Sequence, residues 1–192
     1  MSKQVSKQAS ILWTAQDLKL LPEDSNCYEV IGGNLIVSRA PSLLHQEVIG
    51  NLLAEIKFYL RQSPVGKIWL TPGLTFSSID SVIPDLAFIR QEKLFSLASG
   101  EHLKGAPDLA VEVLSPGTEN IRRDRVAKLK LYSNYSISEY WIVDPKKKTL
   151  EVYRLNSTTK ALELVDTLDQ NQTLSSPLLP GFSCKLTDIF SY

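Results

Sequence analysis

The sequence predicts an α/β (α+β) domain in which a mixed β-sheet is packed by helices on its faces. Helical and strand-like segments alternate along the 192 residues, and no linker long enough to divide the chain occurs. Hydrophobic residues make up 43% and charged residues 22%, which provides enough apolar material for a sizeable core and excludes global disorder. We expect Met1–Ser10 to be a flexible tail and residues 11–192 to form one domain.

The expected elements follow in order from apolar periodicity and turn residues. A short helix is expected at Thr14–Leu21, and a hairpin at Tyr28–Val37 turns at Gly32-Gly33-Asn34. A longer helix from Pro41-Ser42 to Arg61 carries apolar residues at spacings of three and four. The later expected elements are strands at Lys67–Phe76, Val82–Arg90 and Asp108–Leu114, a helix from Thr118 to Tyr135 with Thr118 as N-cap, a hairpin at Glu139–Leu155, a strand at Leu162–Leu168 and a C-terminal segment Leu186–Phe190.

Charge and cysteine content narrow the classes of function. The formal net charge is zero, with 21 basic and 21 acidic residues, which argues against a protein that coats nucleic acid by bulk electrostatics. Cys27 and Cys184 are too few for a disulfide framework and lack metal-ligand spacing. The polar N-terminus does not resemble a signal peptide, and no stretch approaches the ~20 apolar residues that span a bilayer. We therefore expect a cytoplasmic protein without membrane contact.

Two acidic residues within apolar runs are the strongest candidates for chemistry. Glu112 lies in Leu109–Leu114, which is otherwise typical of a buried strand, and Asp85 lies in the apolar run Val82–Ile89. A buried carboxylate is costly unless it is paired or bound to metal. Two converging carboxylates repel each other, and a hard cation such as Mg²⁺, which takes oxygen ligands, removes that conflict. The alternatives are a structural ion pair at Glu112 and a turn-adjacent acid at Asp85.

Lys128 is expected to complete this site. The helical period places Asp124, Lys128 and Tyr132 on one face, together with apolar residues. A lysine on an apolar helix face is unexpected, and this favours a functional role. The alternative is an Asp124–Lys128 ion pair worth ~0.3–0.5 kcal/mol.

Further candidates surround this set. Glu29, in the first strand of the N-terminal hairpin, and His45, near the start of the long helix, are supporting candidates, together with Asp124 and Tyr132. Basic residues of the later helix are candidates for contact with a nucleic-acid backbone, with a solvated charged face as the alternative. These basic residues are Arg122, Arg123, Arg125 and Lys130.

Several motifs, taken in order, resemble a known family. They are Tyr28-Glu29-Val30-Ile31-Gly32-Gly33, Pro41-Ser42 with His45-Gln46, Pro84-Asp85-Leu86, Pro107-Asp108-Leu109-Ala110-Val111-Glu112-Val113-Leu114-Ser115-Pro116, Asp124-x-x-x-Lys128-x-x-x-Tyr132 and Glu139-Tyr140-Trp141-Ile142-Val143-Asp144-Pro145. From about Leu12 to Lys185 the chain resembles the Uma-type bacterial restriction endonuclease family of the PD-(D/E)XK nuclease superfamily. The resemblance implies a restriction endonuclease-like core, in which helices flank a mixed central sheet, with an extra N-terminal helix and β-hairpins.

The resemblance also implies a reaction and a set of site residues. The superfamily carries a catalytic Asp on one strand and Glu-x-Lys on the next; Asp85 and Glu112 match, whereas Leu114 stands at the lysine position. The Uma-type pattern draws its lysine from the following helix, where Lys128 matches. The implied activity is Mg²⁺- or Mn²⁺-dependent hydrolysis of phosphodiester bonds in DNA. Asp85, Glu112 and the Val113 carbonyl would bind the metal, and a homodimer would suit cleavage of both strands.

Two other functions remain open. One is a catalytically inactive module that keeps the fold and binds nucleic acid or protein, which predicts no metal affinity at Asp85 and Glu112. The other is hydrolysis of a different substrate by the same carboxylates. Glycoside hydrolysis, for example, needs paired carboxylates ~5–10 Å apart but does not need the lysine.

Overall fold

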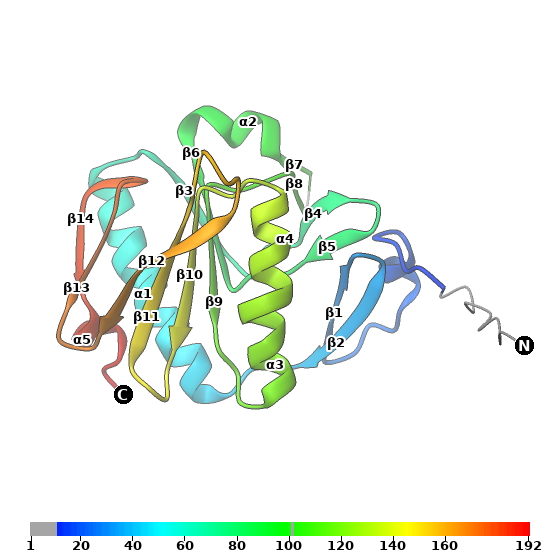
Figure 1. The fold of residues 1–192 in the computed structure, drawn as a ribbon, viewed down its shortest axis with the longest axis horizontal. Coiled ribbons are helices and arrows are strands. Elements are labelled where there is room, and N and C mark those ends of the chain that lie inside the picture. The colour runs from blue at the N-terminus through cyan, green and yellow to red at the C-terminus, as the bar shows by residue number, and fades with distance from the viewer. Residues whose placement is uncertain (1–10, 101) are drawn as a thin grey trace, which may run out of the picture.

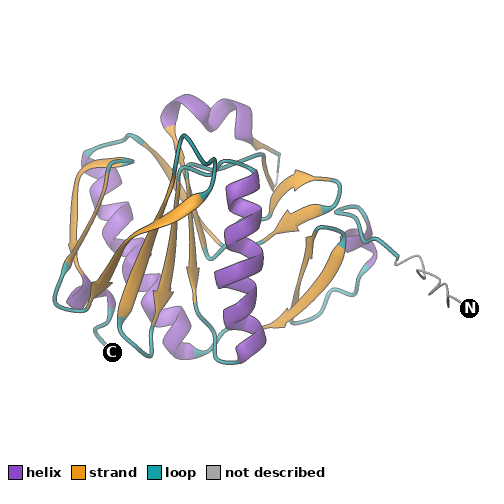
Figure 2. Ribbon diagram, viewed as in Figure 1, coloured by secondary structure: helices purple, strands orange, loops and turns teal. Residues whose placement is uncertain are grey.

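Residues 11–100 and 102–192 are described by a computed structural model of the chain (Figure 1). The predicted tail, Met1–Ser10, lies outside the described residues. A six-stranded sheet stands between one long helix on one face and a second helix on the opposite face (Figure 2). Two further sheets, of six and two strands, accompany it. This architecture confirms the predicted α+β class.

The central sheet has the strand order β12-β11-β10-β9-β6-β3. Strands β9 and β10 run parallel, and the other neighbouring pairs run antiparallel. A parallel pair needs a long crossover, which the helix between these two strands supplies. The strands are β3 (Gly66–Leu70), β6 (Leu86–Arg90), β9 (Leu109–Val113), β10 (Glu139–Asp144), β11 (Thr149–Leu155) and β12 (Leu162–Asp169).

Two helices cover the faces of the central sheet. Helix α1 (Leu43–Gln62) begins after Ser42, whose hydroxyl caps it by accepting a hydrogen bond from the His45 N–H at 3.3 Å. The crossover helix consists of α3 (Thr118–Arg122), a π-helical segment η3 (Arg123–Lys128) and α4 (Leu129–Asn134). The shorter helices are η1 (Asp17–Leu20), η2 (Gln91–Lys93), α2 (Leu94–Leu97) and α5 (Leu186–Ile189). Within residues 11–100 and 102–192, each helix is too short or too polar to cross a membrane.

The second sheet lies beside the central sheet and has the order β2-β1-β5-β4-β8-β7. Strands β1 and β2 form the predicted hairpin, and Gly32 and Gly33 both have positive φ angles, 57° and 74°, as a tight primed turn requires. The strands of this sheet are β1 (Asn26–Ile31), β2 (Asn34–Arg39), β4 (Leu74–Ser77), β5 (Asp80–Val82), β7 (Ala98–Ser99) and β8 (His102–Lys104). A separate hairpin is formed by β13 (Thr173–Ser176) and β14 (Leu179–Lys185).

Side chains of the central strands alternate between two hydrophobic clusters. In β9, Val111 and Val113 belong to the cluster that α1 covers, whereas Ala110 and the following Leu114 belong to the cluster that α4 covers. Successive residues of a strand point to opposite faces of the sheet. Glu112 therefore points to the α4 face, toward the crossover helix.

Two predicted strands are interrupted in the structure. The run Lys67–Phe76 forms β3 and β4, because Thr71 adopts a positive φ of 44° and Pro72 lacks an N–H for a strand ladder. The run Val82–Arg90 forms β5 and β6, and Pro84 lies in the break between them. The prediction that Asp85 lies inside a strand was therefore wrong, since Asp85 directly precedes β6.

Some helix ends and short elements also differ from the prediction. The expected helix at Thr14–Leu21 is the single 3₁₀ segment η1, and the N-cap of α3 is Gly117 and not Thr118. Gly117 has a φ of 113°, a conformation that favours glycine. The prediction missed α2, β7 and β8, because two to four residues show no clear period. It also missed the hairpin of β13 and β14, where Pro177, Pro180 and Gly181 indicated an irregular segment.

Candidate active site

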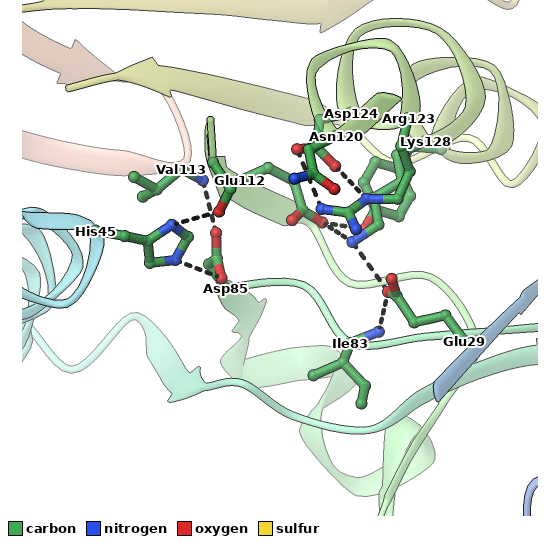
Figure 3. Close-up of polar contacts among 12 residues, drawn as sticks. Glu29, His45, Ile83, Asp85, Glu112, Val113, Asn120, Arg123, Asp124 and Lys128 are labelled. Carbon is green, nitrogen blue, oxygen red and sulfur yellow. Dashed lines mark hydrogen bonds and ion pairs between the residues drawn. The ribbon is translucent and has the colours of Figure 1, made fainter. Parts of the chain in front are cut away.

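A cleft of about 550 Å³ brings the predicted catalytic residues together. Its walls come from the start of α1, the end of β9, the crossover helix, strands β1 and β2 of the second sheet, and the segment between β5 and β6, with Thr71 after β3. Asp85, Glu112 and Lys128 all line it, although they come from separate segments of the chain (Figure 3). The supporting candidates Glu29 and His45 line the same cleft.

Asp85 is held by the Val113 N–H and by the His45 ring at the point where β6 and β9 separate. The ladder between these strands includes Leu86 opposite Val111, and beyond it the Val113 N–H donates to Asp85 Oδ2 at 2.6 Å. The Asp85 carboxylate thus replaces the backbone carbonyl of a neighbouring strand as the acceptor for the Val113 N–H, which therefore keeps a hydrogen-bond partner. Asp85 Oδ1 lies 3.1 Å from His45 Nε2.

Glu112 is buried on the α4 face with 2% exposure, and it contacts two groups of the crossover helix. Its Oε1 accepts hydrogen bonds from Lys128 Nζ at 2.9 Å and from the Tyr132 hydroxyl at 2.8 Å. Burial raises the pKa of Glu112 well above its usual range; the Lys128 charge opposes this shift, and the carboxylates of Asp124 and Asp85 add to it. The ionised form of Glu112 is therefore costly unless positive charge lies close to it, as Lys128 does.

Lys128 joins Glu112 to the second sheet. Its Nζ lies 2.9 Å from Glu112 Oε1 and 2.9 Å from Glu29 Oε1, and its side chain is almost completely buried. Burial alone would lower the pKa of Lys128, but the carboxylates of Glu112, Glu29 and Asp124 outweigh it and raise the pKa above the usual range. Lys128 is therefore a permanent cation near neutral pH.

Asp124 is held by its neighbour in sequence. Arg123 Nε lies 2.9 Å from Asp124 Oδ1, so the partner of Asp124 is Arg123, and the alternative Asp124–Lys128 ion pair is not formed. Burial raises the pKa of Asp124, while Lys128 and Arg123 oppose the shift. Asp124 thus adds negative charge near Lys128 without contacting it.

Glu29 and His45 each contact a second group, in addition to Lys128 and Asp85 respectively. Glu29 is 3% exposed, and its Oε1 also accepts a hydrogen bond from the Ile83 N–H at 2.7 Å. His45 is 5% exposed, and its Nδ1 lies 3.4 Å from Ser115 Oγ. Glu29 contacts Lys128 and His45 contacts Asp85, although the residues of each pair lie far apart in the chain. No local sequence pattern reveals such pairs.

The π-helical segment η3 carries both Asp124 and Lys128. π-helical turns inside α-helices are rare and occur often at functional sites. The Asp124 carbonyl oxygen accepts a hydrogen bond at 3.0 Å from the hydroxyl of Tyr140, a buried residue of β10. Tyr140 also packs edge-on against Tyr132, with 5.0 Å between ring centroids. These contacts hold the irregular turn against the sheet.

The four predicted basic residues occupy different environments. Arg123 lines the cleft, whereas Arg125 Nη1 lies 2.6 Å from Glu151 Oε1 on β11. Arg122 and Lys130 are exposed on the helix. Arg39, an exposed residue at the end of β2, lines the cleft and was missed, because a basic residue ending a hairpin strand gives no signal in the sequence.

Comparison with known proteins places the chain in a family. A family model named Uma2, with the description "Putative restriction endonuclease", matches residues 15–187. The chain belongs to the Uma2 family. A search of curated proteins found no match. The crystal structure of an Anabaena variabilis protein, described as a "putative nuclease belonging to DUF820", superposes with a TM-score of 0.72 at 20% identity, and the match covers 93% of this chain and 97% of the other.

The donors in this Uma2-family cleft fit a hard divalent cation. Within the described residues, no three His, Cys, Asp or Glu side chains form a ready-made metal cluster. Mg²⁺, however, usually keeps several waters and binds through one or two carboxylates, and the carboxylates of Asp85 and Glu112 both line this cleft. Among the side chains that line the cleft, the carboxylates of Glu29, Asp85 and Glu112 face the cations Arg39, Arg123 and Lys128. The fit therefore rests on the oxygen donors of the carboxylates and not on an excess of negative charge.

Proposed function

We propose that the chain is a divalent-metal-dependent endonuclease that hydrolyses phosphodiester bonds in DNA. The observation that carries the proposal is the convergence in one cleft of Glu112 from β9, Lys128 from η3 and Asp85 from the segment before β6. Membership of the Uma2 family supports the same reaction class. A glycosidase would need the carboxylates but not the buried lysine between two of them.

In this proposal Asp85 and Glu112 bind Mg²⁺ or Mn²⁺, with the Val113 carbonyl as an additional oxygen donor. When bound, the cation would polarise the scissile phosphate and lower the pKa of a coordinated water. The Val113 N–H and His45 hold Asp85 in one orientation. Lys128, which keeps its proton, stabilises the negative charge that develops on the phosphate.

Positively charged residues around the cleft are proposed to contact the DNA backbone. Arg123 lies on the cleft wall, and the exposed Arg122 and Lys130 extend the positive surface along the helix. Arg125 is already paired with Glu151, so we expect it to contribute less. Such contacts position the backbone without reading its sequence.

The test is cleavage of plasmid and oligonucleotide DNA with Mg²⁺ or Mn²⁺, compared with the same reactions in EDTA. Glu112→Gln and Lys128→Ala are expected to abolish metal-dependent cleavage. The matched controls are Glu163→Gln and Lys57→Ala, which alter exposed residues outside the cleft and should leave cleavage unchanged. Unchanged cleavage in both cleft variants would remove the basis of the assignment.

A catalytically inactive module is the second candidate, and one observation favours it. Lys128 contacts both Glu112 and Glu29, so the site already contains a buried cation that neutralises part of its negative charge. Titration calorimetry with Mn²⁺ separates the two functions. Binding that is lost in Asp85→Asn supports the nuclease, whereas the absence of binding by the wild-type chain supports the inactive module.

A further inference from the structure

A second pocket of about 180 Å³ adjoins the catalytic cleft. The two share Ser42, His45, Ser115 and Pro116 as lining residues, so they are neighbouring parts of one concave surface. Three segments form the pocket: the start of α1, the loop between β9 and α3 together with Ile121 of α3, and the β10–β11 turn. All three lie at the lower edge of the central sheet in Figure 1.

The pocket combines apolar walls with a positively charged edge. Leu44, Leu114, Ile121 and Pro145 supply apolar surface on several sides. Lys146 and Lys147 line it from the β10–β11 turn, and both are exposed. Lysines that served solubility alone would not need to lie beside an apolar pocket. Their position here suits a ligand that has both an apolar part and a negative charge.

The β10–β11 turn holds its two lysines in place through Asp144. Asp144 Oδ1 accepts hydrogen bonds from the backbone N–H groups of Lys146 and Lys147, each at 3.1 Å. The Asp144 side chain is nearly buried and lines the pocket. A phosphate entering the pocket would meet this carboxylate, whereas a phosphate outside it would meet the lysine ammonium groups.

We propose that this pocket receives one nucleobase of the DNA substrate, next to the scissile phosphate, while Lys146 and Lys147 contact a flanking phosphate. The inference rests on the proposed nuclease function and names its substrate class. The pocket is smaller than the ~300–1,000 Å³ of sites for drug-sized ligands, and this size suits a single base. A base stacked in a duplex cannot enter, so the substrate class is single-stranded DNA or DNA with an unpaired nucleotide.

Binding to short single strands, measured by fluorescence anisotropy in EDTA, tests the pocket independently of cleavage. The probes are a labelled oligothymidylate of about eight nucleotides, within the site sizes of single-strand binders, and an abasic strand of equal length and charge. A base in the pocket would bury its faces against the apolar side chains of Leu44, Ile121 and Pro145, which an abasic sugar cannot do. We therefore expect the wild-type chain to bind the thymidylate strand about 10-fold more tightly than the abasic strand.

Two pairs of variants assign this preference to the pocket. Ile121→Trp fills the pocket from a residue that is 38% exposed, and it should remove the preference for the strand that carries bases. Val126→Trp, on the same helix at a residue that is 57% exposed and outside the pocket, should preserve it. Replacing Lys146 and Lys147 together with alanine should weaken binding of both strands. Lys57 and Lys185, replaced together as the control, should not change binding.

The possible outcomes separate this inference from the nuclease proposal. Equal binding of the two strands by the wild-type chain, or no binding of either, overturns the inference. So does a preference that survives in Ile121→Trp. Cleavage of duplex DNA without a preference for bases would leave the nuclease proposal intact and refute the pocket. A preference for bases without metal-dependent cleavage would support the pocket and refute the nuclease.

Discussion

Replacing Lys128 with methionine isolates the charge at the centre of the site. Methionine keeps an unbranched apolar stem in the space that Lys128 fills, so the main loss is the ammonium group. That group lies 2.9 Å from Glu112 and 2.9 Å from Glu29, and both carboxylates are nearly inaccessible to solvent. The variant therefore leaves two buried acids without their common partner.

The expected cost follows from this burial. Removing one partner of a buried ion pair costs ~3–5 kcal/mol, because the remaining charge is left uncompensated. For a chain of this size, each kcal/mol lowers the melting temperature by ~2–4 °C, so we expect Lys128→Met to melt roughly 6–20 °C lower. The double variant Glu112→Gln/Lys128→Met removes one of the two orphaned charges and should recover part of this loss.

The assay is urea unfolding in EDTA, followed by tryptophan fluorescence at several pH values. Loss of the Lys128 charge raises the pKa of Glu112 further, so the native state binds a proton that the unfolded state releases. A raised native pKa gives stability that is lost as pH rises. The deficit of Lys128→Met should therefore be larger at neutral than at acidic pH. A loss below 1 kcal/mol at neutral pH, or no pH dependence of the deficit, would refute the reasoning.

Three further predictions concern other parts of the molecule. His45→Ala removes a contact of Asp85 and should weaken Mn²⁺ binding ~10–100-fold in calorimetry; unchanged affinity would show that His45 does not orient this ligand. Burial of Asp108 would raise its pKa, but hydrogen bonds from Arg90 and Lys93 outweigh it and lower the pKa. The stability that Asp108 contributes is therefore present above its unfolded pKa of ~3.9 and lost as pH falls, and Asp108→Asn should flatten this part of the acid unfolding curve. Burial, followed by nearby carboxylates, raises the pKa of Cys184 to about 12, so its thiol should resist Ellman's reagent at pH 8 in the folded chain and react after unfolding.

The sequence indicates some site residues because their chemistry conflicts with their surroundings. Glu112 stands out as an acid in an apolar strand, and Lys128 as a cation on an apolar helix face. Each conflict can be recognised from the hydrophobic period of a single strand or helix. The structure then shows Glu112, Lys128 and Asp85 in the same cleft.

The contacts that the sequence did not predict join residues of different elements. Glu29 meets Lys128 and His45 meets Asp85 only because the second sheet and α1 pack beside the central sheet. No pattern within one element encodes these contacts. The break in the strand before Asp85 was also missed, because hydrophobicity continues across Pro84 while the ladder of backbone hydrogen bonds does not.

The π-helical segment η3 also bears on how this helix can change in length during evolution. A π turn contains one residue more than an α turn, so a single insertion or deletion at this point can be absorbed locally. The packed residues of α3 and α4 would stay in place, and the main change would fall on Asp124 and Lys128. A change in the length of this turn would thus move the charged groups of the cleft and leave the hydrophobic core in place. Homologues that retain the lysine are expected to retain the extra residue, whereas homologues without the lysine are free to lose it.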